Sequence, residues 1–301
     1  MPRFAVRTLT LNPAIDVWSE ADKVAPERKI RTCCERIDPG GGGINVARAL
    51  ARFGVAVEAV FLAGGATGRA LEEMLDRERI TCRCVPLAED TRMSLTIHER
   101  STGSEYRFVP EGPTITPREI EAAREAIIAE SSDYLVASGS LPPGIPDDFY
   151  GGVSKIARRQ GSRFILDTYG SELKAALSSG GLFLLKASRE EVDARGAQQI
   201  VESGEAEYVA LTLGADGALL IGAEGTFALP AVVTDPVSTV GAGDSFLAGM
   251  TYGLTQKQPP LESFRLAVAF AAAATLSPGT DLAHPEHVDR LLGEVGEPRR
   301  L

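Results

Sequence analysis

The chain has 301 residues, enough for one large α/β domain or for such a domain with a small appendage. Its formal net charge of −10 argues against non-specific nucleic-acid binding, which requires a basic face, and its hydrophobic content of 44% is that of an ordinary globular protein. No apolar run approaches the roughly 20 residues of a membrane-spanning helix, and residues 1–12 lack the apolar region of a signal peptide. We therefore expect no nucleic-acid partner, no membrane partner and a cytoplasmic location.

Apolar residues recur with strand-like and helix-like spacing in turn along the chain. In the first third this pattern predicts two units, each a strand followed by a helix. Such units have right-handed connections and build a parallel sheet. The predicted strands lie at 6–12 and 57–65, and the predicted helices at 44–54 and 68–80.

Two segments interrupt this pattern. Residues 92–109 alternate apolar and polar side chains around a turn at 101–104, which predicts a hairpin with one face in water. Residues 16–38 are also irregular and strand-like. We expect the segments 16–38 and 84–112 to form a small β-sheet lid that covers a site or meets a partner.

After the hairpin the alternation of strands and helices resumes. We therefore expect an α/β fold in a single domain at 1–301, with a doubly wound, mostly parallel sheet, helices on both faces and the small β-sheet lid. The later strands are predicted at 133–140, 163–168, 182–188 and 208–214, and the later helices at 117–130, 149–161, 244–254, 261–276 and 285–295.

Glycine clusters occur where predicted strands pass into helices. They lie at 39–45, 63–68, 138–144 and 241–245. In an open parallel sheet, ligands bind at the carboxyl ends of the strands, and glycine lets the backbone come close to a ligand. The alternative is that these turns need glycine for their own conformation. Four clusters at one edge favour a ligand site.

The stretch GAGDS at 241–245 opens a predicted helix. Free N–H groups at a helix start attract anions, and the small residues Gly241, Ala242 and Gly243 leave room for a phosphoryl group. Asp244 is then placed to accept a proton from a substrate hydroxyl, so it is the candidate catalytic base. The alternative is that Asp244 only caps the helix.

Polar side chains suited to a sugar phosphate lie in the first third of the chain. Asp16 follows the first strand and Asn45 starts the first helix, and carboxylate and amide groups are natural partners of vicinal hydroxyls. Lys29 and Arg92 lie on or beside the expected lid, where they can hold a phosphate. The alternative for each basic residue is a solvated surface charge.

The four cysteines come in two close pairs. Cys33 and Cys34 are adjacent, and one residue separates Cys82 from Cys84. Neither pair has the spacing of a zinc finger. We expect reduced thiols without a role in function.

These motifs together resemble the ribokinase/PfkB family of ATP-dependent carbohydrate kinases. GGGGINVARALARFG at 40–54 is similar to the N-terminal signature of the family, and STVGAGDSFLAGM at 238–250 is similar to its C-terminal signature. Within the family the chain is most similar to the type 2 6-phosphofructokinases, through PGGGGINVA, AGGATG, SEYRFV and SGSLPPG. The related 1-phosphofructokinases and tagatose-6-phosphate kinases usually have lysine at the position of Gly42.

The resemblance implies ATP and Mg²⁺ as cofactors, a sugar phosphate as substrate and a homodimer formed through the lid. It casts Asp244 as the base and Gly241, Ala242 and Gly243 as the anion hole. The implied sugar-phosphate residues are Asp16, Lys29, Gly41, Gly42, Asn45, Arg92 and Ser140, and the implied ATP residues are Lys186, Ser188, Thr212, Gly214, Gly217 and Ser238. Glu191 is implied to organise Mg²⁺ indirectly, and a monovalent cation such as K⁺ is implied at carbonyls of Ser238, Val240, Ala274, Ser277 and Gly279.

The chain departs from the family pattern at two of these positions, Ser188 and Ser277, where the family commonly has asparagine. The family motif KPNxxE reads KASREE at 186–191, so Ser188 stands where asparagine is expected. A hydroxyl is shorter than an amide and cannot both donate and accept at the same reach. We expect a weaker hold on nucleotide and Mg²⁺ unless water fills the gap.

The activity implied by the resemblance is transfer of a phosphoryl group from ATP to the 1-hydroxyl of fructose 6-phosphate, a step of glycolysis. Tagatose-6-phosphate kinase and 1-phosphofructokinase activities are the alternatives within the family. A non-catalytic sugar-phosphate sensor is the alternative from another class, and the intact GAGDS argues against it.

Overall fold

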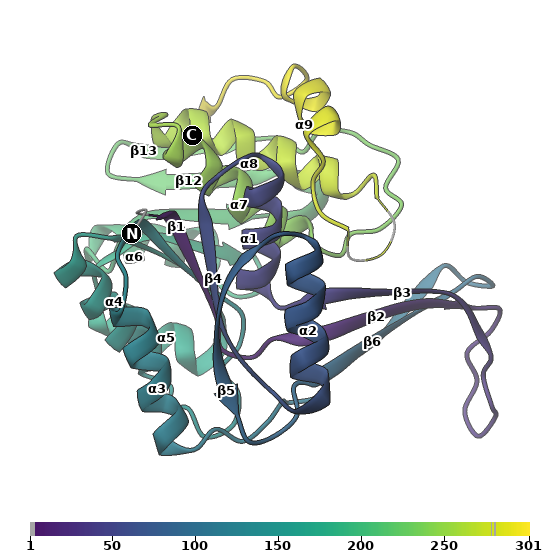
Figure 1. Cartoon of the computed structure of the whole chain (residues 1–301). Coiled ribbons are helices and arrows are strands. Elements are labelled where there is room, and N and C mark those ends of the chain that lie inside the picture. The colour runs from purple at the N-terminus through teal and green to yellow at the C-terminus, as the bar shows by residue number, and fades with distance from the viewer. Residues whose placement is uncertain (1–3, 278, 280) are drawn as a thin grey trace.

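The computed structural model describes residues 4–277, 279 and 281–301, and it contains a large and a small sheet (Figure 1). In this part of the chain the large sheet has the strand order β14-β13-β12-β11-β10-β9-β8-β1-β4-β5, parallel from β11 to β5 and antiparallel from β11 to β14. Its strands are β1 Phe4–Thr10, β4 Val57–Gly64, β5 Thr81–Leu87, β8 Ser132–Ser138, β9 Arg163–Asp167, β10 Leu182–Ser188, β11 Ala206–Thr212, β12 Ala218–Gly222, β13 Gly225–Leu229 and β14 Arg299–Arg300.

Helices cover both faces of the large sheet, because its strands carry apolar side chains on both sides. On β1, Val6 packs into one hydrophobic core with helices α1, α2, α7, α8 and α9, whereas Leu9 packs into a second core with α3 to α6. No helix in the described residues combines the length and the hydropathy needed to cross a membrane. The helices are α1 Gly42–Arg52, α2 Gly65–Arg77, α3 Pro117–Ile128, α4 Phe149–Gln160, α5 Gly170–Ser179, α6 Ala194–Glu202, α7 Ala242–Thr255, α8 Pro260–Ala274 and α9 Pro285–Leu292.

This arrangement confirms the predicted doubly wound, mostly parallel α/β fold with a second, smaller sheet. Every strand and helix predicted outside the two irregular segments is present, with ends shifted by a few residues. The antiparallel edge strands β12 and β13 were not predicted, because each is a short segment beside a tight turn at 222–225.

The small sheet projects from one side of the helical layers (Figure 1). Its strands follow the order β3-β2-β6-β7, and β2 runs parallel to β6. The segment 84–112 that was assigned to the lid begins inside β5, which pairs with β4, so residues 84–87 belong to the large sheet. The strands of the small sheet are β2 Ala14–Ala21, β3 Thr32–Gly40, β6 Arg92–Glu99 and β7 Ser104–Phe108.

The register of the small sheet separates its side chains into two faces. Val17 pairs with Ile37 and Leu95, and Leu95 pairs with Phe108, so these four side chains share one apolar face. We call this the outer face of the small sheet. Asp16 and its partner Ser94 lie on the opposite, polar face.

Candidate active site

Several of the predicted site residues lie at the carboxyl edge of the large sheet. Lys186 and Ser188 lie near the end of β10 and Thr212 ends β11, and the aspartate Asp167 ends the neighbouring β9. Helices α1 and α7 begin beside these strand ends, because the glycine clusters turn the chain back over the sheet. Parallel strands bring their carboxyl ends to one edge, which is where ligands bind in such sheets.

Asp244 lies in the first turn of α7 but does not cap that helix. The capping position is Gly241, which has φ 78° and no side-chain capping bond. The Asp244 carboxylate instead accepts a hydrogen bond of 2.8 Å from Nδ2 of Asn45 in α1. Burial raises the pKa of Asp244 to about 6, against the opposing effects of the Asn45 hydrogen bond and the Lys186 charge. This is a carboxylate poised for proton transfer near neutral pH.

A lysine faces the turn that precedes Asp244. A Cβ atom at Gly243 would lie 3.3 Å from Nζ of Lys186, so glycine keeps this approach open. The Lys186 ammonium donates to Oδ1 of Asp167 at 3.1 Å. Burial lowers the pKa of Lys186, but the charges of Asp167 and Asp244 outweigh it, and the pKa is raised. Lys186 is therefore a fixed positive charge beside the glycine turn at 241–243.

Asp167 was missed by the sequence reasoning. It accepts hydrogen bonds from both Lys186 and Ser138, the latter at 3.2 Å. The signal was present, because an aspartate is the next-to-last residue of the predicted strand 163–168, at the same edge as the other site residues. Which residues lie beside Asp167, however, depends on the order of the strands in the sheet, and the sequence pattern does not give that order.

The glycine run at 40–43 makes room for side chains of the site. A Cβ atom at Gly40 would lie 2.1 Å from the Asp16 carboxylate, and one at Gly42 would lie 2.1 Å from Oγ of Ser138. Gly41 has φ 109°, which side chains other than glycine rarely adopt. Glycine is thus required here for close approach as well as for the turn.

Asp16 lies on the polar face of the small sheet, turned toward the site. Burial raises the pKa of Asp16, although the nearby charges of Arg107 and Arg92 and a hydrogen bond from Ser94 act in the opposite direction. Two guanidinium groups therefore surround a partly desolvated carboxylate. A ligand that carries both hydroxyls and a phosphate matches this combination.

Arg92 has one unsatisfied donor. Its Nη atoms donate to the carbonyls of Pro110 and Asn12, each at 2.8 Å. Its Nε is buried and has no hydrogen-bond partner within the described residues. Because buried donors are rarely left unpaired, this atom points to a ligand acceptor.

A cavity of about 510 Å³ lies beside Arg92, between the start of the small-sheet strand β6 and the loop that follows β8 of the large sheet. Ser140 lines it too, so the predicted sugar-phosphate residues Arg92 and Ser140 share this cavity. The Ser140 hydroxyl accepts a hydrogen bond of 3.5 Å from Nδ2 of Asn12. Lys29 does not join them. It is exposed in the loop between β2 and β3, at the far end of the small sheet (Figure 1).

The predicted nucleotide residues follow the carboxyl ends of β10 and β11. The backbone N–H of Ser188 donates to Oε2 of Glu191 at 2.7 Å. Arg189 turns away from this pair and binds Asp216 and the carbonyl of Leu213. Gly214 begins a short 3₁₀ turn and Gly217 follows it, with φ values of 63° and 100°. A Cβ atom at Gly217 would lie 2.1 Å from the carbonyl of Leu229, whereas, apart from its chain neighbours, none of the described residues comes within 4 Å of one at Gly214.

The predicted monovalent-cation residues lie together beside the start of α7. Ser238 donates through Oγ to the carbonyl of Gly279 at 3.1 Å and accepts from Val240 N–H at 3.2 Å. The carbonyl of Ala274 accepts from the N–H of Ser277 at 3.2 Å. Carbonyl and hydroxyl oxygens are suitable ligands for a hard cation.

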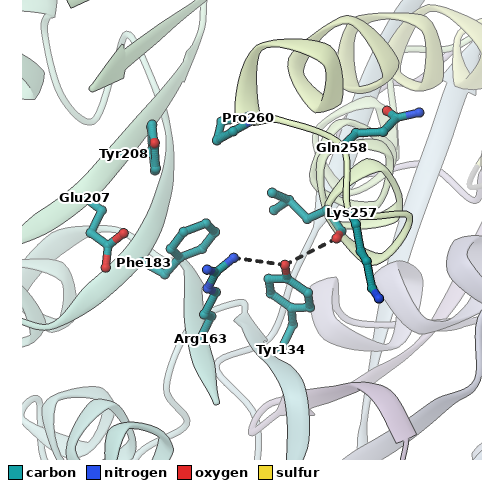
Figure 2. A pocket seen from close by; sticks show the side chains of 9 residues that line it. Tyr134, Arg163, Phe183, Glu207, Tyr208, Lys257, Gln258 and Pro260 are labelled. Carbon is teal, nitrogen blue, oxygen red and sulfur yellow. Dashed lines mark hydrogen bonds between the residues drawn. The ribbon is translucent and has the colours of Figure 1, made fainter. Parts of the chain in front are cut away.

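A second cavity, of about 340 Å³, lies at the opposite edge of the large sheet (Figure 2). Tyr134, Arg163 and Phe183 line it near the amino ends of their strands. The Tyr134 hydroxyl accepts from Arg163 and donates to the carbonyl of Leu254, both at 3.3 Å. None of the predicted site residues lines this cavity.

The carboxyl edge of this doubly wound sheet combines a glycine turn at a helix start, a buried carboxylate and a paired lysine. These are the elements of a phosphoryl-transfer site of the kind that kinases use. The family model described as pfkB family carbohydrate kinase matches residues 10–287. The chain belongs to this family.

Relatives of known name are similar over nearly the whole chain. A Mycobacterium tuberculosis (strain H37Rv) protein named ATP-dependent 6-phosphofructokinase isozyme 2 is 39% identical, with 98% of this chain and 91% of that protein covered. The 1-phosphofructokinase of Bacillus subtilis is 31% identical, with 96% and 98% covered. The crystal structure of Escherichia coli phosphofructokinase-2 in complex with potassium has a TM-score of 0.92 and 36% identity, with 97% and 99% covered.

Proposed function

We propose that this protein is an ATP-dependent 6-phosphofructokinase, which transfers the γ-phosphoryl group of ATP to the 1-hydroxyl of fructose 6-phosphate. The observation that carries the proposal is the position of Asp244, held by Asn45 beside the glycine turn and the Lys186 ammonium. Identity to the named 6-phosphofructokinase exceeds identity to the named 1-phosphofructokinase, 39% against 31%, and supports this substrate.

In the proposed reaction Asp244 accepts the proton of the attacking hydroxyl. Asn45 orients the carboxylate, and its own buried Oδ1, which has no partner among the described residues, is available to a substrate hydroxyl. The N–H groups at 241–243 and the Lys186 ammonium stabilise the charge on the transferred group. Because the donors are in place before substrate arrives, little reorganisation is needed.

The sugar phosphate is proposed to lie between the polar face of the small sheet and α1. Asp16 and Asn45 bind hydroxyls, and Arg92 binds the phosphate through the Nε that lacks a partner. The related 1-phosphofructokinases and tagatose-6-phosphate kinases usually have lysine at the position of Gly42, so this glycine supports fructose 6-phosphate over their substrates.

ATP is proposed to lie along Lys186, Ser188, Thr212, Gly214 and Gly217. Mg²⁺ is proposed to be organised indirectly by Glu191, whose charge acts on Lys186 together with that of Asp167, and when bound it would neutralise phosphate charge. A monovalent cation such as K⁺ fits the oxygens around Ser238 and Gly279. The positions of these groups near the proposed anion hole support the binding of both ions.

A panel of sugar phosphates tests the substrate. ADP release, measured with a coupled assay, is expected with fructose 6-phosphate in preference to tagatose 6-phosphate, fructose 1-phosphate and fructose. Preference for another sugar phosphate would assign the neighbouring activity of the family. Binding of fructose 6-phosphate without ADP release would support the non-catalytic sensor instead.

We further propose a homodimer that forms through the outer face of the small sheet, in the cytoplasm. The side chains of Ile37, Leu95 and Phe108 on this face are 51%, 38% and 57% exposed. A contiguous exposed apolar face marks a site of association. Ile37→Lys should give monomers by sedimentation, whereas Val233→Lys, at an apolar residue 93% exposed elsewhere, should leave the dimer intact.

A further inference from the structure

Two adjacent cysteines on β3 place their sulfurs on the same side of the small sheet. Successive side chains of a strand normally point to opposite faces. Here the pairing of β2 with β3 shifts between Trp18 and Glu20, where two residue steps on β2 face three on β3. Cys34 within this bulge has φ 59°, which is uncommon for a residue other than glycine. As a result the sulfurs of Cys33 and Cys34 lie 3.5 Å apart.

A carboxylate completes the cluster. Glu20 on β2 pairs directly with Cys33, so both side chains lie on one face of the sheet. One ligand atom from each of Glu20, Cys33 and Cys34 lies within 4.8 Å of the others, and in the described part of the chain no other group of this kind occurs. Both cysteines are exposed and free.

The spacing of the sulfurs suits a bridging ion. Zinc–sulfur bonds of about 2.3 Å in tetrahedral geometry place two sulfurs ~3.8 Å apart. A disulfide instead requires a distance of about 2.05 Å. The sulfurs are in contact at 3.5 Å through an S–H···S hydrogen bond, so they need to separate by only roughly 0.3 Å to hold one ion between them.

We propose that Glu20, Cys33 and Cys34 form a binding site for a thiophilic divalent cation, of which Zn²⁺ is the example, with water as the remaining ligand. On binding, each thiol loses its proton to solvent and the two thiolates and the carboxylate bond to the ion. No electron transfer is involved. The ion ties the end of β2 to the start of β3 and so closes the loop at 22–31 at its base.

One existing contact must be released. Arg100 lies 3.5 Å from the Glu20 carboxylate and 2.6 Å from that of Asp22. The Arg100 side chain is 47% exposed in both pairs, with Glu20 26% and Asp22 90% exposed, and such partly solvated pairs contribute modestly to stability. Arg100 can keep Asp22 while Glu20 turns to the ion.

Cadmium titration of the reduced, metal-free full chain tests the site. Cd²⁺ bound to thiolates absorbs in the ultraviolet, so the absorbance should rise and saturate at one ion per chain, and Zn²⁺ should displace the signal. Cys33→Ser and Cys34→Ser should each abolish saturation. Glu20→Gln should weaken the affinity by on the order of tenfold or more.

The other cysteine pair provides a matched control. Cys82 and Cys84 are half-buried on β5, and within the described residues they belong to no group of three possible metal ligands. The double variant Cys82→Ser/Cys84→Ser should bind Cd²⁺ as the parent does. A parent chain without a saturable signal, a signal lost with Cys82 and Cys84 instead, or saturation at one ion per two chains would overturn the proposal.

Discussion

The carboxyl edge of the large sheet and the small sheet differ in how their polar groups are held. At the edge, Asn45 holds Asp244, and Asp167 holds Lys186, through hydrogen bonds of 2.8 and 3.1 Å within the protein. On the small sheet, by contrast, Arg92 keeps a buried donor without a partner in the described residues. The outer face of that sheet is apolar and exposed.

The two regions therefore divide the reaction chemistry from ligand recognition. Groups that are already paired in the free protein are oriented for reaction, so their loss should lower kcat. Groups that wait for a ligand should mainly affect KM, because their interactions form on binding. Four substitutions test this division.

The largest effect is expected at Asp244. Asp244→Asn keeps the shape but removes the base, and kcat should fall on the order of 10²–10⁴-fold. The melting temperature at neutral pH should not fall. Burial raises the pKa of Asp244, so ionising this carboxyl in the folded protein costs folding free energy, and that cost is complete above about pH 6. Kinetics and thermal melts of the purified variant provide the measurement.

Asp193 provides the matched control for that substitution. Its carboxylate caps α6 by accepting from the N–H of Gly196. Asp193→Ala should lower stability by about 1 kcal/mol and leave kcat unchanged. A substantially active Asp244→Asn enzyme would contradict the mechanism.

The next effect is expected on the small sheet. Arg92→Ala removes the proposed phosphate ligand, and a lost charged hydrogen bond of about 1.5–3 kcal/mol corresponds to a rise of roughly 10–100-fold in KM for fructose 6-phosphate. KM for ATP should change little. Arg100→Ala, on the same sheet but paired with Asp22, should change neither constant. An equal rise in KM for fructose 6-phosphate and KM for ATP in Arg92→Ala would contradict the division between the two regions.

A smaller effect is expected in the pH profile. Asp244 must be deprotonated to act, so kcat/KM should fall as the pH drops through about 6. The Asn45 hydrogen bond lowers the Asp244 pKa, so Asn45→Ala should move this midpoint upward by roughly one unit. An unchanged midpoint would show that another group controls the acid limb of the profile.

The smallest effect is expected at Ser188. Asparagine offers a donor and an acceptor where serine offers one short hydroxyl. Ser188→Asn should lower KM for MgATP by about threefold to tenfold, within the modest range of one neutral hydrogen bond, with a smaller change in kcat. Saturation curves at fixed free Mg²⁺ give the answer. A KM that stays the same or rises would mean that water already replaces the amide, since Arg189 is bound to Asp216.

Much of the fold could be predicted from the sequence because its strands and helices have strong local patterns. The position of Asp244 at the start of a helix followed from GAGDS, and the structure places it there. The antiparallel strands β12 and β13 could not be predicted with the same rules, since short segments carry weak periodicity. The functional roles of Ser140, Thr212 and the other site residues stay predictions.

Local side-chain patterns were sufficient to predict the alternation of strands and helices, and with it the edge of the sheet at which residues such as Lys186 and Asp244 lie. Local spacing is enough for this, because parallel strands all end at the same side of their sheet. The pairing of Asp167 with Lys186, and the grouping of Cys33 and Cys34 with Glu20, are evident only in the folded protein. Those contacts depend on strand order and on a bulge, which arise from packing between segments far apart in the chain.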